Sequence, residues 1–284
     1  MTNFADDEIY EDCLVTFLDI LGFRQLLHTQ SGSGIIRILN TFREITLPDD
    51  IARPTRSDEM RLNSEANVEI VSDAIVRFRT TETQYRSGAL IWELIDLLHI
   101  QIACVANRIL VRGALTVGPL HVGLDLSGPV FGPALVEAYE MESSEVIFPR
   151  IAIHEDVIER HRNQTSLWRE GHDFEDEQQH LDSLIRQDDS GTYYLDYLRG
   201  SLSEMDDGYL GWVGFLQHHK NIVEDGLANQ TNRAVRRKYA WLARYQNEVI
   251  AGELIKVRPD AFFEEYELPL SDVLEALRIT ELEA

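Results

Sequence analysis

The order of apolar segments in the first half of the chain restricts its fold more than any other feature. Short strand-like runs alternate with helix-like stretches, and the periodicity of each run separates the two types. The expected elements are a strand over 13–20, a helix over 22–42, a hairpin joined at Ser72 and Asp73, a helix over 89–110, a strand pair turning at Gly118 and Pro119, a helix over 133–145 and a strand over 150–154. The order βαββαβ predicts a mixed α/β (α+β) domain with a ferredoxin-like open sheet and helices on one face.

The second half of the chain is less regular. It is polar and acidic from His154 to Asp189, offers one short strand in "TYYLDYL", and then contains helical stretches over 203–226, 229–251 and 270–281. No linker rich in Gly, Pro or Ser separates it from the first half. We therefore expect residues 10–155 to form the core and residues 156–284 to form a mainly helical extension packed on that core.

Composition limits the classes of function. No apolar run approaches the roughly 18 to 20 residues of a membrane helix, and the acidic N-terminus "MTNFADDEIYED" is unlike a signal peptide, so we expect a cytoplasmic protein without a membrane partner. The net charge of −23, from 49 acidic and 26 basic residues, disfavours polymeric DNA or RNA as a partner. A small phosphorylated substrate stays open, because bound divalent cations can invert the local field.

Asp19 lies at the end of the apolar run over 13–20, where an unpartnered carboxylate is costly. In a ferredoxin-like sheet the first strand is central and the hairpin lies beside it, so Asp73 falls at the same sheet edge as Asp19 and the Ile20 carbonyl. Two close carboxylates repel each other, and a pair of Mg²⁺ or Mn²⁺ ions would keep both ionised and could serve phosphoryl transfer. The alternative is that Asp73 is a turn residue and Asp19 a helix N-cap.

Four motifs, in this order, resemble those of one enzyme family. The segments "FLDILGF", "VEIVSDAIVRF", "VRGALTVGPL" and "FGPALVEAYEMES", all within residues 10–155, are similar to the characteristic stretches of class III nucleotide cyclase domains. The resemblance implies a ferredoxin-like cyclase core, a nucleoside triphosphate substrate and two Mn²⁺ or Mg²⁺ ions per site. It also implies a homodimer with its sites at a two-fold interface, in which a monomer would be inactive.

The resemblance gives individual positions a role. Asp19, the Ile20 carbonyl and Asp73 fall on the metal positions, and the two aspartates would be catalytic. Glu69 falls on a position that reads the base in purine cyclases. Phe17 lies two residues before Asp19, so it points to the same side of the strand and would contact the nucleotide.

Other positions depart from the pattern of purine cyclases. Pro129 falls on the second base-reading position, and Val136 and Glu140 fall where that family carries its transition-state Asn and Arg. An apolar side chain cannot orient the ribose, and an acid repels the triphosphate. The departures look like the pyrimidine cyclases of the bacterial anti-phage systems called Pycsar, which convert UTP or CTP to the cyclic monophosphate. In such an enzyme Arg112 would be the replacement cation for the phosphates; the alternative is an ion-paired strand arginine.

These features together predict a uridylate cyclase that makes a second messenger in anti-phage defence. UTP is favoured over CTP only because it is the commoner substrate in the family that the chain resembles. Two rival classes stay open. Glu69 could accept hydrogen bonds from guanine, which suits a guanylyl cyclase. Val136 and Glu140 suit a cyclase fold that binds a nucleotide or a partner without catalysis.

Overall fold

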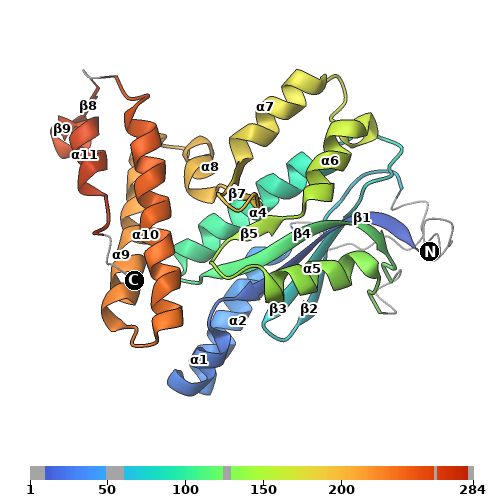
Figure 1. Cartoon of the computed structure of the whole chain (residues 1–284), viewed down its shortest axis with the longest axis horizontal. Helices are drawn as coiled ribbons and strands as arrows, with labels where there is room; N and C mark the ends of the chain where they lie inside the picture. The colour runs from blue at the N-terminus through green and yellow to red at the C-terminus, as the bar shows by residue number, and fades with distance from the viewer. Residues whose placement is uncertain (1–9, 49–60, 124–128, 259–260, 281–284) are drawn as a thin grey trace. The chain divides into compact units, whose positions relative to one another are not determined.

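The computed structural model describes residues 10–48, 61–123, 129–258 and 261–280. The chain divides into two compact units (Figure 1). The first unit contains Met1–Gln101 and Ile109–Asp196, and the second contains Ile102–Arg108 and Tyr197–Ala284. Compact packing does not define a functional domain, so the expected core over 10–155 and extension over 156–284 stay predictions.

The first unit is built on a seven-stranded mixed sheet with the strand order β2-β3-β1-β4-β5-β7-β6. Its elements are β1 (Glu11–Ile20), α1 (Phe23–Thr29), α2 (Gly32–Thr46), β2 (Asn67–Val71), β3 (Ala74–Thr80), α4 (Ala89–Ala106, which ends in the second unit), β4 (Val111–Leu120), α5 (Pro133–Ser144), β5 (Ile151–Ile153), α6 (Glu155–Asn163), the 3-10 turn η3 (Thr165–Leu167), α7 (Phe174–Leu184), β6 (Ile185–Gln187) and β7 (Tyr193–Leu195). The central position of β1, between β3 and β4, confirms the ferredoxin-like α/β fold.

Helices cover both faces of this sheet, so the expectation of helices on one face is wrong. Thr16 on β1 donates to Glu93 of α4, whereas Thr116 on β4, which shares a face with Val15, donates to the Ala134 carbonyl of α5. Figure 1 shows α4 behind the sheet and α5 in front of it. The physical reason is that β1 is apolar on both faces, and each face needs its own cover.

Two other expectations about local structure are wrong. The helix expected over 22–42 is two helices, because the Ser31 hydroxyl accepts a hydrogen bond from the Gly34 amide at 3.2 Å and caps a new helix there. The strand pair expected to turn at Gly118 and Pro119 is the single strand β4, which pairs with β1 along its whole length. In the described part of the sheet β5 pairs with β4 only at 113–115, so Pro119 removes no ladder hydrogen bond on that side.

Helix α4 covers the face of the sheet that carries Thr16. It is long and apolar enough to cross a membrane by length and composition alone, with a mean hydropathy of 1.7, which corrects the expectation that no such run exists. However, 61% of this segment is buried inside the protein, as in the core helix of a globular domain. Leu90, Ile91 and Leu94 are completely buried.

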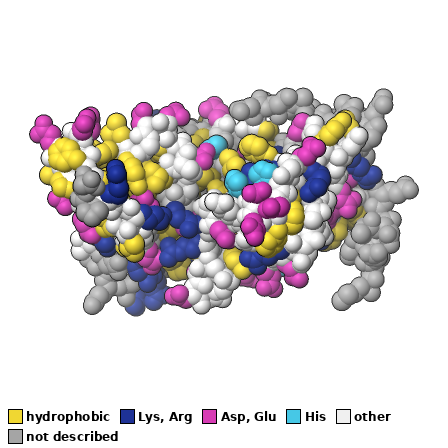
Figure 2. Space-filling model, turned by 90° about the horizontal axis from the view of Figure 1, so that it is seen from above, with side chains coloured by type: hydrophobic (Ala, Val, Ile, Leu, Met, Phe, Trp, Pro, Cys, Tyr) yellow, Lys and Arg dark blue, Asp and Glu magenta, His cyan; other side chains and the backbone are white. Residues whose placement is uncertain are grey.

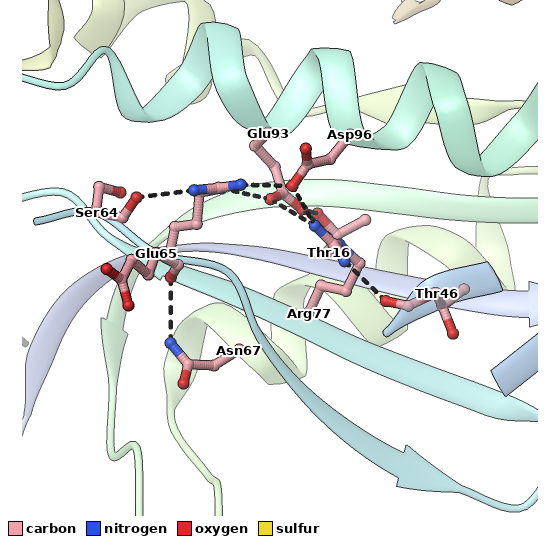
Figure 3. A network of polar contacts seen from close by, with 9 residues as sticks. Thr16, Thr46, Ser64, Glu65, Asn67, Arg77, Glu93 and Asp96 are labelled. Carbon is pink, nitrogen blue, oxygen red and sulfur yellow. Dashed lines mark hydrogen bonds and ion pairs between the residues drawn. The ribbon is translucent and has the colours of Figure 1, made fainter. Parts of the chain in front are cut away.

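A buried charge network joins α4 to the sheet (Figure 3). Arg77 and Arg79 on β3 contact Glu93 at 3.2 and 2.9 Å, and Arg77 also contacts Asp96 at 2.7 Å. The Glu93 side chain is only 1% exposed. Burial alone would raise the pKa of Glu93, but the two guanidinium groups outweigh it and lower this pKa. The network therefore stays ionised and fixes α4 on β3.

The second unit is helical, apart from one two-stranded sheet in its described part. Its elements are α8 (Tyr197–Glu204), α9 (Tyr209–Asn229), α10 (Arg233–Leu254), β8 (Phe262–Phe263), the 3-10 turn η4 (Glu264–Tyr266), β9 (Leu268–Pro269) and α11 (Leu270–Ala276). Trp212 and Leu216 on α9 and Leu242 and Ile250 on α10 are buried. Despite the net charge of −23, Lys and Arg side chains gather on part of the surface (Figure 2); α10 alone exposes Arg233, Arg236, Arg237 and Arg244.

Candidate active site

The register of the central strands places Asp19 between two neighbours. Asp19 is the second-last residue of β1, opposite Ala74 of β3 on one side and Arg112 of β4 on the other. Its side chain is 19% exposed. Asp19 is thus a strand residue near the end of the central strand β1. The alternative of a helix N-cap is wrong, because Gly22 occupies the N-cap position of α1.

Asp73 meets Asp19 at this edge, as the sequence predicted. The hairpin between β2 and β3 turns at Ser72 and Asp73, with Ser72 in the left-handed region at φ 61°. Asp73 directly precedes Ala74, the β3 residue that pairs with Asp19, so its carboxylate lies beside the end of β1. Burial raises the pKa of Asp19, Arg112 lowers it and Asp73 raises it again, to a value of about 6. Asp73 therefore disfavours the charged form of Asp19, whereas Arg112 favours it.

Arg112 lies between the carboxylates of Asp19 and Glu142. Its Nη2 and Nε atoms are 3.3 and 3.4 Å from Asp19 Oδ2. Its Nε atom is 2.6 Å from Oε1 of Glu142 on α5, a side chain only 3% exposed, and its Nη1 donates to the Val146 carbonyl at 3.4 Å. Arg112 is thus an ion-paired strand residue at the predicted site. Its positive charge acts on the site from the position that these contacts give it.

Phe17 and Glu69 lie on the same sheet face as Asp19. Phe17 is two residues before Asp19, and the strand register continues from Phe17 through Val76 to Glu69 across β3 and β2. Phe17 and Glu69 are both half-buried. The ring of Tyr139 on α5 meets the Phe17 ring edge-on, with 5.5 Å between centroids. This face therefore combines a carboxylate and an aromatic side chain next to the paired acids.

The donors at this edge suit a hard divalent cation. Asp19 and Asp73 supply carboxylate oxygens, and Ile20, the last residue of β1, would supply its carbonyl. In the described residues no group of three or more His, Cys, Asp or Glu side chains is arranged as a metal centre. A cation here would be held by the two carboxylates and the carbonyl, with water or substrate oxygens filling its other positions, and this is the usual situation of Mg²⁺.

The positions that depart from purine cyclases lie at the surface. Val136 of α5 is 54% exposed, Glu140 is exposed one turn later, and Pro129 is exposed before α5 begins. Glu142, on the same helix, reaches the site through Arg112. The sequence analysis did not select Glu142 or Tyr139, although both lie in the motif "FGPALVEAYEMES".

Comparison with known proteins finds similarity to solved structures only. No protein family model matches the chain, and no curated protein matches its sequence. A bacterial light-regulated adenylyl cyclase is 16% identical, covers 55% of this chain and 81% of its own, and has a TM-score of 0.39. The monomeric guanylyl cyclase domain of the RhoGC fusion protein from the aquatic fungus Blastocladiella emersonii is also 16% identical; 66% of this chain and 95% of that chain are covered, with a TM-score of 0.38.

A third similar structure is the catalytic core of a rhodopsin-guanylyl cyclase with converted specificity, in complex with ATPalphaS. It is 16% identical, covers 66% of this chain and 96% of its own, and has a TM-score of 0.39.

Proposed function

We propose that the chain is a nucleotide cyclase that converts a nucleoside triphosphate to its 3′,5′-cyclic monophosphate and pyrophosphate. One observation carries this proposal: Asp19 on β1 and Asp73, in the turn that leads into β3, come together at one end of these paired strands. Two acids held together in this way form a binding site for divalent cations that can act on phosphates. The motif resemblance described above supports the same reaction.

The residues of the site would have separate roles. Asp19, Asp73 and the Ile20 carbonyl would hold two Mn²⁺ or Mg²⁺ ions. When bound, such ions favour deprotonation of the ribose 3′-hydroxyl and stabilise the leaving pyrophosphate. The bond from O3′ to the α-phosphorus forms as the bond from that phosphorus to the bridging oxygen breaks. Arg112, anchored by Glu142 at 2.6 Å, would add a fixed positive charge beside the phosphates.

For the substrate we propose a pyrimidine nucleotide, with UTP ahead of CTP. Phe17 is a bulky side chain on the same face as Asp19, and Tyr139 packs against it, which supports a pocket too small for a purine. Glu69 can accept a hydrogen bond from uracil N3–H or from the cytosine amine, so it does not choose between them. A guanylyl cyclase is the second candidate, because the carboxylate of Glu69 lies on this same face.

Three finer proposals belong with this function. The active form would be a homodimer, in agreement with the exposed Val136 and Tyr139 side chains of α5, both 54% exposed. The cyclic nucleotide would act as a second messenger in anti-phage defence, which rests on the motif resemblance alone. The protein would act in the cytoplasm.

One experiment tests the reaction and the substrate together. The purified protein is incubated with Mn²⁺ and an equimolar mixture of the four nucleoside triphosphates, and the products are separated by mass. We expect mainly cyclic UMP with one pyrophosphate per turnover. Mainly cyclic CMP would overturn the choice of uracil, mainly cyclic GMP or AMP would overturn the pyrimidine assignment, and no cyclic product would favour a non-catalytic binding module.

Single substitutions test the two acids. Asp19→Ala or Asp73→Ala should lower turnover at least about a thousandfold, because each removes half of the carboxylate pair that the reaction needs. Asp12→Asn is the matched control: Asp12 is on the same strand and pairs with Arg160 at 2.9 Å, and its side chain is 26% exposed. Wild-type turnover in either alanine variant would show that the metal assignment is wrong.

A further inference from the structure

We propose that Arg112 is an exchangeable counter-ion of Asp19, and that Glu142 is the positioning residue that makes the exchange possible. In the metal-free protein Arg112 is paired with both Asp19 and Glu142. When a divalent cation binds, Arg112 leaves Asp19 and stays paired with Glu142. This inference rests on the proposed function, because it concerns the same acid pair. It assigns a role to Glu142, which belongs to neither the predicted metal set nor the predicted nucleotide contacts.

Arg112 contacts the two carboxylates in different ways. Its Nε atom lies 2.6 Å from Glu142 Oε1 as an ion pair without hydrogen-bond geometry, while it donates to Asp19 Oδ2 at 3.3 and 3.4 Å. Hydrogen bonds of that length are at the weak limit. Glu142 is 3% exposed and Asp19 is 19% exposed. Arg112 therefore has its shorter ionic contact with the buried carboxylate and long hydrogen bonds with the carboxylate that faces the site.

The charges of the cluster lead to the same conclusion. Asp19 and Glu142 both contact the guanidinium of Arg112, and Asp73 lies beside Asp19, so this cluster has an excess of two negative charges when all three acids are ionised. One divalent cation neutralises this excess. A monovalent side chain cannot, since Arg112 neutralises only one of the acids. The site is thus electrostatically incomplete with Arg112 alone and complete once a divalent cation joins it.

Glu142 also decides where Arg112 goes during the exchange. Without an anchor, an arginine displaced by a cation would turn to solvent and its charge would be lost to the site. Glu142 and the Val146 carbonyl, at 2.6 and 3.4 Å, retain it beside the strand edge. The retained guanidinium then lies next to the cation, where a phosphate oxygen can bind both groups.

The experiment measures Mn²⁺ affinity by electron paramagnetic resonance of the free ion, without nucleotide, and subtracts the weak binding seen in Asp73→Asn. Arg112→Ala removes the competing cation and should bind Mn²⁺ about tenfold more tightly than wild type. Glu142→Gln should bind it about tenfold more weakly, because Asp19 is then the carboxylate left to Arg112 among the described residues. Structural damage alone would weaken binding in both variants, so the opposite signs identify the exchange.

Two further variants keep the test decisive if a single substitution unfolds the protein. Arg112→Met combined with Glu142→Gln leaves no unpaired buried charge and should bind Mn²⁺ more tightly than Glu142→Gln alone. Arg160→Ala, which breaks the Asp12 pair at the other end of β1, should leave Mn²⁺ affinity unchanged. If wild type binds Mn²⁺ but the removal of Arg112 does not strengthen binding, the exchange is wrong and the metal site stands. If wild type binds no Mn²⁺, the exchange and the metal site are both wrong.

Discussion

At the scale of single residues, His219 shows how one buried side chain makes stability depend on pH. His219 is completely buried in the second unit. Its Nδ1 atom lies 2.6 Å from Gln246 Oε1, and its Nε2 atom lies 2.9 Å from the Tyr197 hydroxyl. Because an amide oxygen only accepts, Nδ1 carries the proton and Nε2 accepts from the tyrosine. Burial lowers the pKa of His219 to about 4.

This lowered pKa gives a prediction with a definite sign. Between the ordinary histidine pKa of 6.5 and the lowered pKa of about 4, the unfolded chain binds a proton that the folded chain does not, so the free energy of unfolding falls as pH drops through this window. The full loss should be about 3 kcal/mol. Urea unfolding of wild type and His219→Gln at a series of pH values measures it. An equal pH dependence in both proteins would contradict the assignment.

The residues of the site differ in how far the sequence could reveal them. Asp19 and Asp73 were predictable because an acid that ends an apolar strand needs a partner, and a two-residue hairpin turn is visible in "IVSDAI". Glu142 was not, because it is one of several acids on a helix that itself has only a weak periodicity. Only the packing of α5 on β4 decides which of these acids is buried against Arg112.

At the scale of elements, long-range contacts decided what local patterns could not. The hairpin of β2 and β3, the long helix α4 and helix α5 were predicted close to their observed bounds, since their periodicity and turn residues are strong local signals. The dipeptide Gly118–Pro119 is an equally strong turn signal, yet pairing with β1 keeps β4 extended through it. Similarly, "IRQ" is too short to give a strand pattern, and β6 exists because it pairs with β7.

The charge network between β3 and α4 predicts a large effect of one substitution. Glu93→Gln removes the carboxylate that contacts both Arg77 and Arg79, and leaves two buried guanidinium groups with only Asp96 as their acid in this network. Breaking a buried ion pair in this way costs about 3–5 kcal/mol. Glu275→Gln, which breaks the exposed pair with Arg278, should cost about 1 kcal/mol or less. Thermal unfolding followed by circular dichroism compares the two variants. Similar losses of stability would show that the buried network contributes no more than the exposed ion pair.

At the scale of the whole molecule, the fold class was predictable and the last two strands of the sheet were not. The order of segments gave the central position of β1, but the sheet continues beyond residue 155 through β6 and β7. The reason is that both strands have only three residues, too few for a period to be recognised. The helices of the second unit were visible as three apolar stretches, whereas α8 is short and begins directly after the strand β7.

The proposed homodimer gives a prediction for the assembled protein. If the site needs a second copy, specific activity should fall on dilution in parallel with the fraction of dimer. Sedimentation velocity gives that fraction, and a turnover assay over the same range of concentration gives the activity. Arg160→Ala, distant from α5 in the sequence and outside the proposed site, should show the same dilution curve. Constant specific activity in a fully monomeric sample would show that one chain carries a complete site.

The buried network of Figure 3 has an evolutionary consequence. Arg77, Arg79, Glu93 and Asp96 neutralise one another, so a lineage that loses one of them must pass through a less stable intermediate before it can lose the rest. Such intermediates are removed by selection when the margin of stability is small. The four residues should therefore be inherited as a set among descendants of a common ancestor, or be replaced together by apolar side chains, and mixed combinations should be rare.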